Sequence, residues 1–264
     1  MPEVSAGGVR FHIQRLPGSP GHPVVVFLHG LVLDNLSSFY YTLAGPVSRA
    51  GAEVVMYDLR GHGRSERPST GYGTATAVTD LAAVLAAAGV DRPVHLVGNS
   101  YGGVIALRAA LDRPDLVAGL ALIEAHCTGD WIDRMTDTLT VSALGLEHDR
   151  VAEQLRGLGA RKEARMAATA DALLNRTSLI EDVAATPAFG PAELGAVRCP
   201  VLAVYGERSE LADAGRDLDR HIRDCTVHIL PGLAHTVLRE ATDLVTGHLL
   251  GWLARVAWPE RVAP

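Results

Sequence analysis

The sequence contains few cysteines: Cys127, Cys199 and Cys225 are the only three in 264 residues. An odd number cannot be fully paired and no CxxC spacing occurs, so we expect neither a disulfide framework nor a zinc knuckle, and a reducing cytoplasm is the simplest compartment. Long apolar runs are also absent, since no stretch approaches about 18 uninterrupted apolar residues. The N-terminus lacks a charged start followed by an apolar segment. The sequence therefore predicts no membrane span and no signal peptide.

Positive charge is scarce as well. The chain has 24 Lys plus Arg against 30 Asp plus Glu, a formal net charge of -6, and it has no dense basic run that could follow a phosphate backbone. It has no HExxH motif and no His or Cys pair at metal-ligand spacing. We therefore expect a small-molecule partner and no nucleic acid, membrane, metal or cofactor. The oligomeric state stays open, with a homodimer as one option.

What the chain does contain is apolar and periodic. Hydrophobic residues make up 48% of it, enough for one large domain or one domain with an insertion. Short β-branched runs alternate with longer amphipathic segments, the pattern of a parallel sheet with crossover helices. The predicted strands are Val9–Arg15, Val24–Leu28, Val54–Asp58, Val94–Val97, Gly119–Glu124, Val201–Tyr205 and Thr226–Leu230.

The region from about His126 to Val197 interrupts this alternation with helix-like stretches and no convincing strand. It predicts a helical cap inserted into the sheet domain, so we divide the chain into an α/β core at residues 1–125 and 197–264 and a cap at residues 126–196. The predicted helices are Leu36–Arg49, Ala75–Ala88, Gly102–Leu111 and Val237–Val256 in the core, and Trp131–Thr140, Asp149–Leu158 and Arg161–Asn175 in the cap.

The strongest chemical signal follows the predicted strand Val94–Val97. The chain there reads Gly98-Asn-Ser-Tyr-Gly-Gly103 and continues into a helix, which is G-x-S-x-G in its strand–turn–helix setting. The serine of such a turn, Ser100, has a strained backbone, and side chains in place of Gly98 or Gly102 would clash with the neighbouring strand and helix. The turn lifts the Ser100 hydroxyl above the carboxyl end of the sheet, beside a helix N-terminus that favours developing negative charge.

Three further motifs stand in the order found in α/β-hydrolase-fold proteins, which the chain resembles over essentially its whole length. They are His29-Gly-Leu31, Asp58-Leu-Arg-Gly-His-Gly-Arg-Ser65 and Pro231-Gly-Leu-Ala-His235, each after a predicted strand. The resemblance implies an α/β fold with a mostly parallel eight-stranded sheet, helices on both faces and a helical cap insertion. His29 and His62 are expected to organise loops near the site.

Catalytic roles follow from chemistry and from the resemblance. A serine hydroxyl is a weak nucleophile near neutral pH and needs a base, a role that His235 can fill before it returns the proton to the leaving group. By the resemblance, the backbone N–H groups of Leu31 and Tyr101 form the oxyanion hole. The expected substrate-binding residues are Gly30, Leu31, His126 and Trp131, although a single apolar residue of the cap is more typical of packing against the sheet.

The acid of the triad is where the sequence departs from the common family pattern. Most relatives carry it in a G-x-x-D turn after the strand that follows the cap, but this turn reads Gly206-Glu-Arg-Ser-Glu210. Its serine, Ser209, cannot stabilise an imidazolium as an anion does. The favoured acid is Glu124 at the end of an otherwise apolar strand, where some dehalogenases and lactone hydrolases of this fold carry theirs. Glu210 is the alternative acid, and a structural ion pair with a cap arginine is the alternative role for Glu124.

An acyl-enzyme on Ser100 indicates a hydrolase of carboxylic esters or lactones, and the apolar side chains of the cap favour a moderately hydrophobic substrate. Serine at this position argues against the dehalogenases and epoxide hydrolases of the fold, which use aspartate. A biosynthetic thioesterase or cyclase and a carbon–carbon bond hydrolase are alternatives with the same triad. A ligand receptor on the same scaffold is a further, non-enzymatic alternative.

Overall fold

The computed structural model describes the chain except residues 1, 127, 148–160 and 259–264. In the described residues, eight strands form one sheet in the order β1-β2-β4-β3-β5-β6-β7-β8. The pairs β1–β2 and β2–β4 are antiparallel, and all other pairs are parallel. The strands are β1 (Glu3–Ala6), β2 (Val9–Leu16), β3 (Val24–Leu28), β4 (Glu53–Tyr57), β5 (Val94–Asn99), β6 (Val117–Ile123), β7 (Val201–Gly206) and β8 (Cys225–Leu230).

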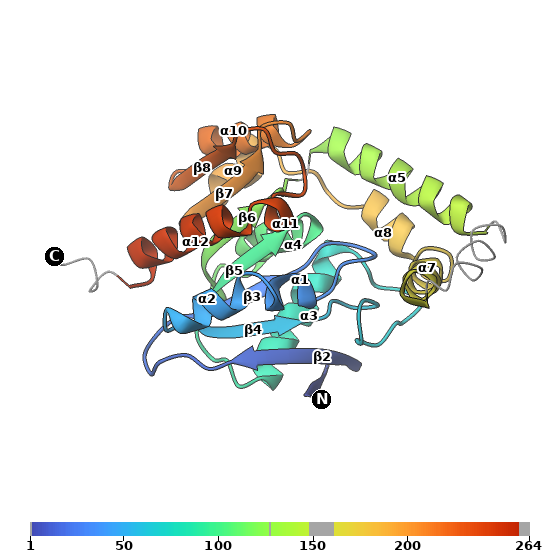
Figure 1. Ribbon diagram of the computed structural model, residues 1–264, viewed down its shortest axis with the longest axis horizontal. Helices are drawn as coiled ribbons and strands as arrows, with labels where there is room; N and C mark the ends of the chain where they lie inside the picture. The colour runs from blue at the N-terminus through green and yellow to red at the C-terminus, as the bar shows by residue number, and fades with distance from the viewer. Residues whose placement is uncertain (1, 127, 148–160, 259–264) are drawn as a thin grey trace.

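Helices cover both faces of the sheet (Figure 1). All five residues of β3 are buried, and they alternate between two hydrophobic clusters, one on each face, which is why this strand must be apolar throughout. Side chains of α3, α4 and α10 join one cluster, and those of α1, α2, α11 and α12 join the other. These helices are α1 (Ser37–Tyr40), α2 (Ala44–Arg49), α3 (Thr74–Ala87), α4 (Tyr101–Asp112), α10 (Ala212–His221), α11 (Val237–Glu240) and α12 (Thr242–Val256).

The predicted fold class, an α/β fold with a mostly parallel eight-stranded sheet and helices on both faces, is confirmed. Four elements are missing from the sequence prediction: the short edge strand β1, helix α10, and the helices α8 (Leu179–Ala184) and α9 (Pro191–Ala196). The expected helix Leu36–Arg49 is two helices, α1 and α2, because Pro46 lies in the first turn of α2, where its missing N–H costs no hydrogen bond. The expected helix Val237–Val256 is also two helices, with a break at Ala241, where φ is -132°.

The segment between β6 and β7 contains α5 (Gly129–Glu147), α7 (Arg161–Leu174), α8 (Leu179–Ala184) and α9 (Pro191–Ala196). The first three contact one another and lie together at one side of the molecule (Figure 1). The predicted helix Asp149–Leu158 lies outside the described residues. The boundaries of core and cap stay a prediction. In the part of the chain that the structure describes, no helix is both long and apolar enough to cross a membrane.

Candidate active site

Ser100 occupies the turn between β5 and α4. Its backbone has φ 52° and ψ -122°, a conformation that L residues rarely adopt. The glycines around it make this turn possible: a Cβ on Gly98 would lie 2.4 Å from the Cα of Gly103, and a Cβ on Gly102 would lie 2.0 Å from the carbonyl oxygen of Leu28. Ser100 therefore sits on a strained turn at the carboxyl end of β5.

Glu124 directly follows β6, the strand beside β5. Its carboxylate is fully buried, and it accepts one hydrogen bond from the Gly206 N–H and another from the Ser209 hydroxyl. Its backbone also has a positive φ, 50°. A buried carboxylate is stable only when polar groups replace its water, and these donors from the end of β7 and the turn after it do so.

His235 lies in the loop between β8 and α11. Its Nδ1 is 3.1 Å from Glu124 Oε2, and its side chain is 39% exposed. The loop is held against β7, because the Arg208 N–H donates to the Leu233 carbonyl oxygen at 2.8 Å and a Cβ on Gly206 would lie 2.4 Å from that same oxygen. A carboxylate at Nδ1 orients the ring in the way that a histidine base requires.

Ser100 and His235 are not joined directly. Within the described residues, their side chains make no hydrogen bond to each other. Contacts of this kind are often long in a free enzyme and shorten when the substrate binds. Glu210, the alternative acid, is exposed, and His235 contacts Glu124 instead. The tertiary structure thus brings Glu124 to the histidine.

Ser209 is the site residue that sequence reasoning missed. It is buried, its hydroxyl donates to Glu124 Oε2, and its oxygen accepts the Leu211 N–H at 3.1 Å. A signal was present, because Ser209 stands where the family pattern has an aspartate. Spacing alone cannot show that this hydroxyl faces a carboxylate from another strand.

Gly30 and Leu31 follow β3 and approach Ser100. A Cβ on Gly30 would lie 3.6 Å from Ser100 Cβ. The Gly30 N–H donates to Asp34 Oδ2 at 2.8 Å, so this donor is occupied within the loop. Leu31 therefore remains the candidate in this loop for an N–H that faces an oxyanion, and Tyr101, the first residue of α4, is the other candidate.

Two buried histidines hold the loop after β3. His29 Nε2 accepts the Leu59 N–H at 2.9 Å, so Nδ1 carries the proton and donates to the Gly30 carbonyl oxygen at 2.7 Å. His62 Nε2 accepts the Val32 N–H at 2.9 Å. Burial lowers the pKa of both rings, that of His62 to about 3, so both are neutral near pH 7. They organise loops beside the site, as the sequence predicts.

His126 and Trp131, two expected substrate-binding residues, are both buried. The Trp131 indole stacks on the Tyr101 ring with centroids 6.5 Å apart and planes at 14°, which packs α5 against α4. Neither ring nitrogen of His126 has a hydrogen-bond partner among the described residues, and burial lowers its pKa. Contact of either side chain with a substrate stays a prediction.

An apolar cavity of about 680 Å³ lies between the loop after β3 and the helices α5 and α7. Ser100 and His235 do not line it, but Leu31 does, and its neighbour Gly30 approaches Ser100. A cavity of this size and character suits the apolar part of a small molecule. Other walls of the apolar cavity are Leu33, Leu139, Met166, Ala170 and Leu174.

No group of three or more His, Cys, Asp or Glu side chains that could hold a metal ion occurs within the residues described.

Comparison with known proteins agrees with the observed fold. A family model described as alpha/beta hydrolase fold matches residues 23–191. RutD of Variovorax paradoxus, a candidate carbamate hydrolase, is 30% identical over 256 residues, which cover 86% of this chain and 91% of that protein. A 2-hydroxy-6-oxononadienedioate/2-hydroxy-6-oxononatrienedioate hydrolase of Klebsiella pneumoniae is 27% identical over 274 residues, which cover 96% of this chain and 94% of that protein. The solved structure of Est816, described as an N-acyl homoserine lactone degrading enzyme, matches with a TM-score of 0.72 and 25% identity over 95% of this chain and 100% of that chain.

Proposed function

Because the chain belongs to the α/β hydrolase fold family, we propose that it is a serine hydrolase that cleaves a carboxylic ester or lactone of a moderately hydrophobic small molecule through an acyl-enzyme on Ser100. The family and the relatives make the chain a hydrolase, and the bond it cleaves and its catalytic residues are the proposal. The observation that carries it is the contact of His235 with Glu124 beside the strained turn of Ser100.

The reaction proceeds in two halves. Ser100 Oγ bonds to the carbonyl carbon of the substrate and its proton passes to His235, while the C=O π pair moves onto oxygen. The carbonyl then re-forms, the bond to the alcohol oxygen breaks, and that oxygen takes the proton from His235. Water next bonds to the acyl carbon, loses a proton to His235, and displaces Ser100, which regains its proton as the acid departs.

Charge stabilisation is divided between backbone and side chain. The N–H groups of Leu31 and Tyr101 donate to the tetrahedral oxyanion, and such fixed donors are the largest contribution in many acyl-transfer enzymes. The Glu124 carboxylate stabilises the imidazolium of His235 through the hydrogen bond at Nδ1. The buried donors to Glu124 hold its carboxylate in place while the histidine charge changes.

Two observations support the substrate class. The apolar cavity begins at Leu31, so an apolar part attached to the reacting carbonyl can extend into it. Est816, described as a lactone-degrading enzyme, matches nearly the whole chain. A carbamate, which the name of the Variovorax relative suggests for that protein, offers a serine the same carbonyl carbon and belongs among the substrates to assay.

The test is the Ser100→Ala variant. The wild-type protein should hydrolyse p-nitrophenyl octanoate and react with a fluorophosphonate probe, and Ser100→Ala should lose the labelling and lower kcat by at least about a thousandfold. Ser5→Ala, at an exposed position of β1, is the matched control and should retain both activities. Mass spectrometry of the labelled peptide identifies the modified residue. Labelling that persists in Ser100→Ala would place the nucleophile elsewhere and overturn the proposal.

A carbon–carbon bond hydrolase with the same triad is the second candidate, because the Klebsiella relative covers nearly the whole chain and its named substrate carries a ketone. The two reactions differ in the leaving group, which takes its proton at oxygen in an ester and at carbon in a diketone. A panel of esters, lactones, carbamates, acyl thioesters and vinylogous diketones, assayed with wild type and Ser100→Ala, separates them. A kcat/KM for the diketone above that of every ester would favour the second candidate.

A further inference from the structure

A second cavity, of about 590 Å³, adjoins the same loop after β3. It is bounded by β2, by residues 32–37 of that loop, by the loop after β4 and by α7. More of its lining side chains can form hydrogen bonds than in the apolar cavity, so we call it the polar cavity. These side chains include His12, Gln14, Asn35, Ser37 and Tyr40.

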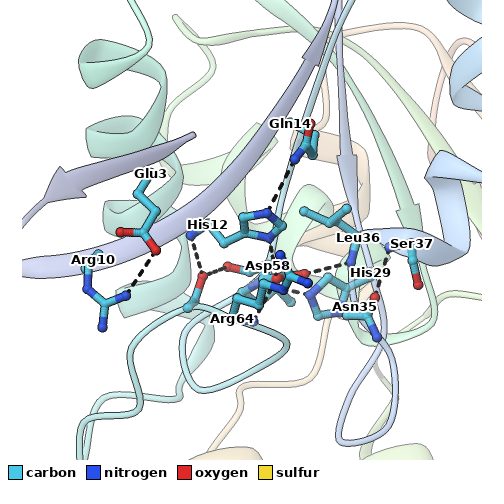
Figure 2. Close-up of polar contacts among 12 residues, drawn as sticks. Glu3, Arg10, His12, Gln14, His29, Asn35, Leu36, Ser37, Asp58 and Arg64 are labelled. Atoms are coloured by element: carbon cyan, nitrogen blue, oxygen red, sulfur yellow. Dashed lines mark hydrogen bonds and ion pairs between the residues drawn. The ribbon is translucent and has the colours of Figure 1, made fainter. Parts of the chain in front are cut away.

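A buried pair, His12 and Asp58, fixes the walls of the polar cavity (Figure 2). His12 Nδ1 lies 2.8 Å from Asp58 Oδ2, and the two side chains are 7% and 3% exposed. The same carboxylate accepts the Leu36 N–H at 2.9 Å and the Arg64 N–H at 2.8 Å. One side chain therefore joins β2, the loop after β3 and the loop after β4, and the cavity keeps its shape before any ligand binds.

The polar cavity offers both an acceptor and a donor. Figure 2 shows the Gln14 amide directed at His12, with the Gln14 nitrogen 3.4 Å from His12 Nε2. In the described residues, the amide oxygen of Gln14 and the amide nitrogen of Asn35 make no hydrogen bond. A hydroxyl or an amide can donate to the first and accept from the second.

The charges around the polar cavity favour a neutral ligand. Its walls include two acidic residues, Asp34 and Asp58, and one arginine, Arg64. Both carboxylates already accept hydrogen bonds from protein groups, among them the Gly30 N–H on Asp34. Their negative charge opposes a ligand carboxylate or phosphate, because the walls formed by described residues carry a single guanidinium, that of Arg64. A neutral hydroxyl or amide group therefore fits the polar cavity best.

The two cavities share walls in the loop after β3, which approaches Ser100. Residues 32–33 and Met166 line both of them. Asp34 of the polar cavity binds the Gly30 N–H at 2.8 Å, and a Cβ on Gly30 would lie 3.6 Å from Ser100 Cβ. An ester carbonyl bound beside Ser100 has two substituents, and the two cavities that share this loop differ in chemical character.

We propose that the substrate is an amphipathic ester whose apolar acyl chain lies in the apolar cavity and whose alcohol part, bearing neutral hydroxyl or amide groups, lies in the polar cavity. This substrate class rests on the proposed function. Tyr41 lines only the polar cavity and is 81% exposed, so the polar cavity opens to water. The alcohol leaves first, and from this position it can reach water while the acyl group stays on Ser100.

The test compares propyl octanoate with 2,3-dihydroxypropyl octanoate, which differ only by two hydroxyl groups on the alcohol part. Wild-type kcat/KM should be at least about tenfold higher for the dihydroxypropyl ester, because each hydrogen bond to a half-buried amide of Gln14 or Asn35 favours it severalfold. Gln14→Leu keeps the bulk and removes the amide, so it should reduce this preference by about tenfold, mainly through KM. The anionic 2-carboxyethyl octanoate should be a poorer substrate than propyl octanoate.

Two further variants complete the design. Tyr40→Phe removes one hydroxyl without a change in packing, and it should reduce the preference by about twofold or more even if Gln14→Leu does not fold. Leu244→Gln, at an exposed position of α12, is the control and should keep the preference of the wild type.

The outcomes separate this inference from the proposed function. Ser100-dependent turnover of both esters with equal kcat/KM, or a preference that Gln14→Leu and Tyr40→Phe leave unchanged, would overturn the two-cavity assignment and leave the proposed function standing. No turnover of these esters or of p-nitrophenyl octanoate would overturn both.

Discussion

At the scale of the residue, a buried carboxylate and the hydroxyl beside it position the histidine. Glu124 reaches from β6 to His235 Nδ1 at 3.1 Å, and the Ser209 hydroxyl donates to the carboxylate oxygen that makes this contact. Hydrogen bonds to an ionised group are stronger than those between neutral groups, so this arrangement is well defined. In the common family pattern, a single aspartate in the turn after β7 is the acid. Here the long Glu124 side chain at the end of β6 contacts the histidine, and the Ser209 hydroxyl in the turn after β7 donates to Glu124.

The choice between the two candidate acids leads to a prediction at this scale. Glu124→Gln should lower kcat by about ten-thousandfold, because an amide neither stabilises the imidazolium nor keeps the proton on Nδ1. Glu210→Gln, at an exposed position, should change kcat by less than about threefold. Steady-state kinetics with p-nitrophenyl octanoate measure both variants. The reverse ranking would assign the acid to Glu210.

At the scale of the element, helix α5 packs against α4, the helix that directly follows Ser100. Trp131, Leu139 and Ala143 are buried and share one face of the helix at a spacing of four or eight residues, whereas Val141 on another face is 69% exposed. The Trp131 ring stacks on Tyr101, which directly follows Ser100. The position of α5 is therefore coupled to the start of α4, where an oxyanion donor is expected.

The packing role of Trp131 can be separated from a role in substrate binding. Trp131→Ala should lower the free energy of unfolding by about 3–5 kcal/mol, because it removes a fully buried ring and its stacking contact with Tyr101. Trp131→Phe should lose less than half of that. Thermal and urea unfolding measure the stability, and kcat/KM is measured on the same samples. A higher KM for Trp131→Ala without loss of stability would instead identify Trp131 as a substrate-binding residue.

At the scale of the whole molecule, buried neutral histidines are spread over the fold. His29, His62, His95 and His126 are all buried. Burial lowers the pKa of all four, to about 3 for His62 and to about 4 for His95. Their unfolded pKa is about 6.5. The unfolded chain therefore binds protons that the folded protein excludes, and acid favours unfolding.

This linkage predicts how stability depends on pH. Above about pH 6.5, these histidines should not affect the free energy of unfolding. At lower pH, each of them should reduce it by up to about 1.4 kcal/mol per pH unit. His62→Gln, whose amide oxygen can still accept the Val32 N–H, should reduce the slope by the share of one histidine. His221→Gln, at the half-exposed end of α10, is the control. Urea unfolding between pH 7 and pH 4.5 measures the slopes, and an unchanged slope in His62→Gln would contradict the prediction.

The sequence by itself determined the sheet with its covering helices and the turn at Ser100, because both depend on local patterns. Apolar runs such as Val24–Leu28 show that a strand is buried on both faces, and the glycines around Ser100 specify a turn that bulkier residues would block. The break between α1 and α2 was also within reach, since Pro46 marks it.

Only the tertiary structure decided which polar groups meet. Glu124 contacts Ser209, 85 residues later in the chain, and His235, 111 residues later, because β6, β7 and β8 are neighbours in the sheet. His12 meets Asp58, 46 residues away, because β2 pairs with β4. A hydroxyl or imidazole has the same local signature whatever faces it, so its partner is set by strand order and register, which a single sequence does not display.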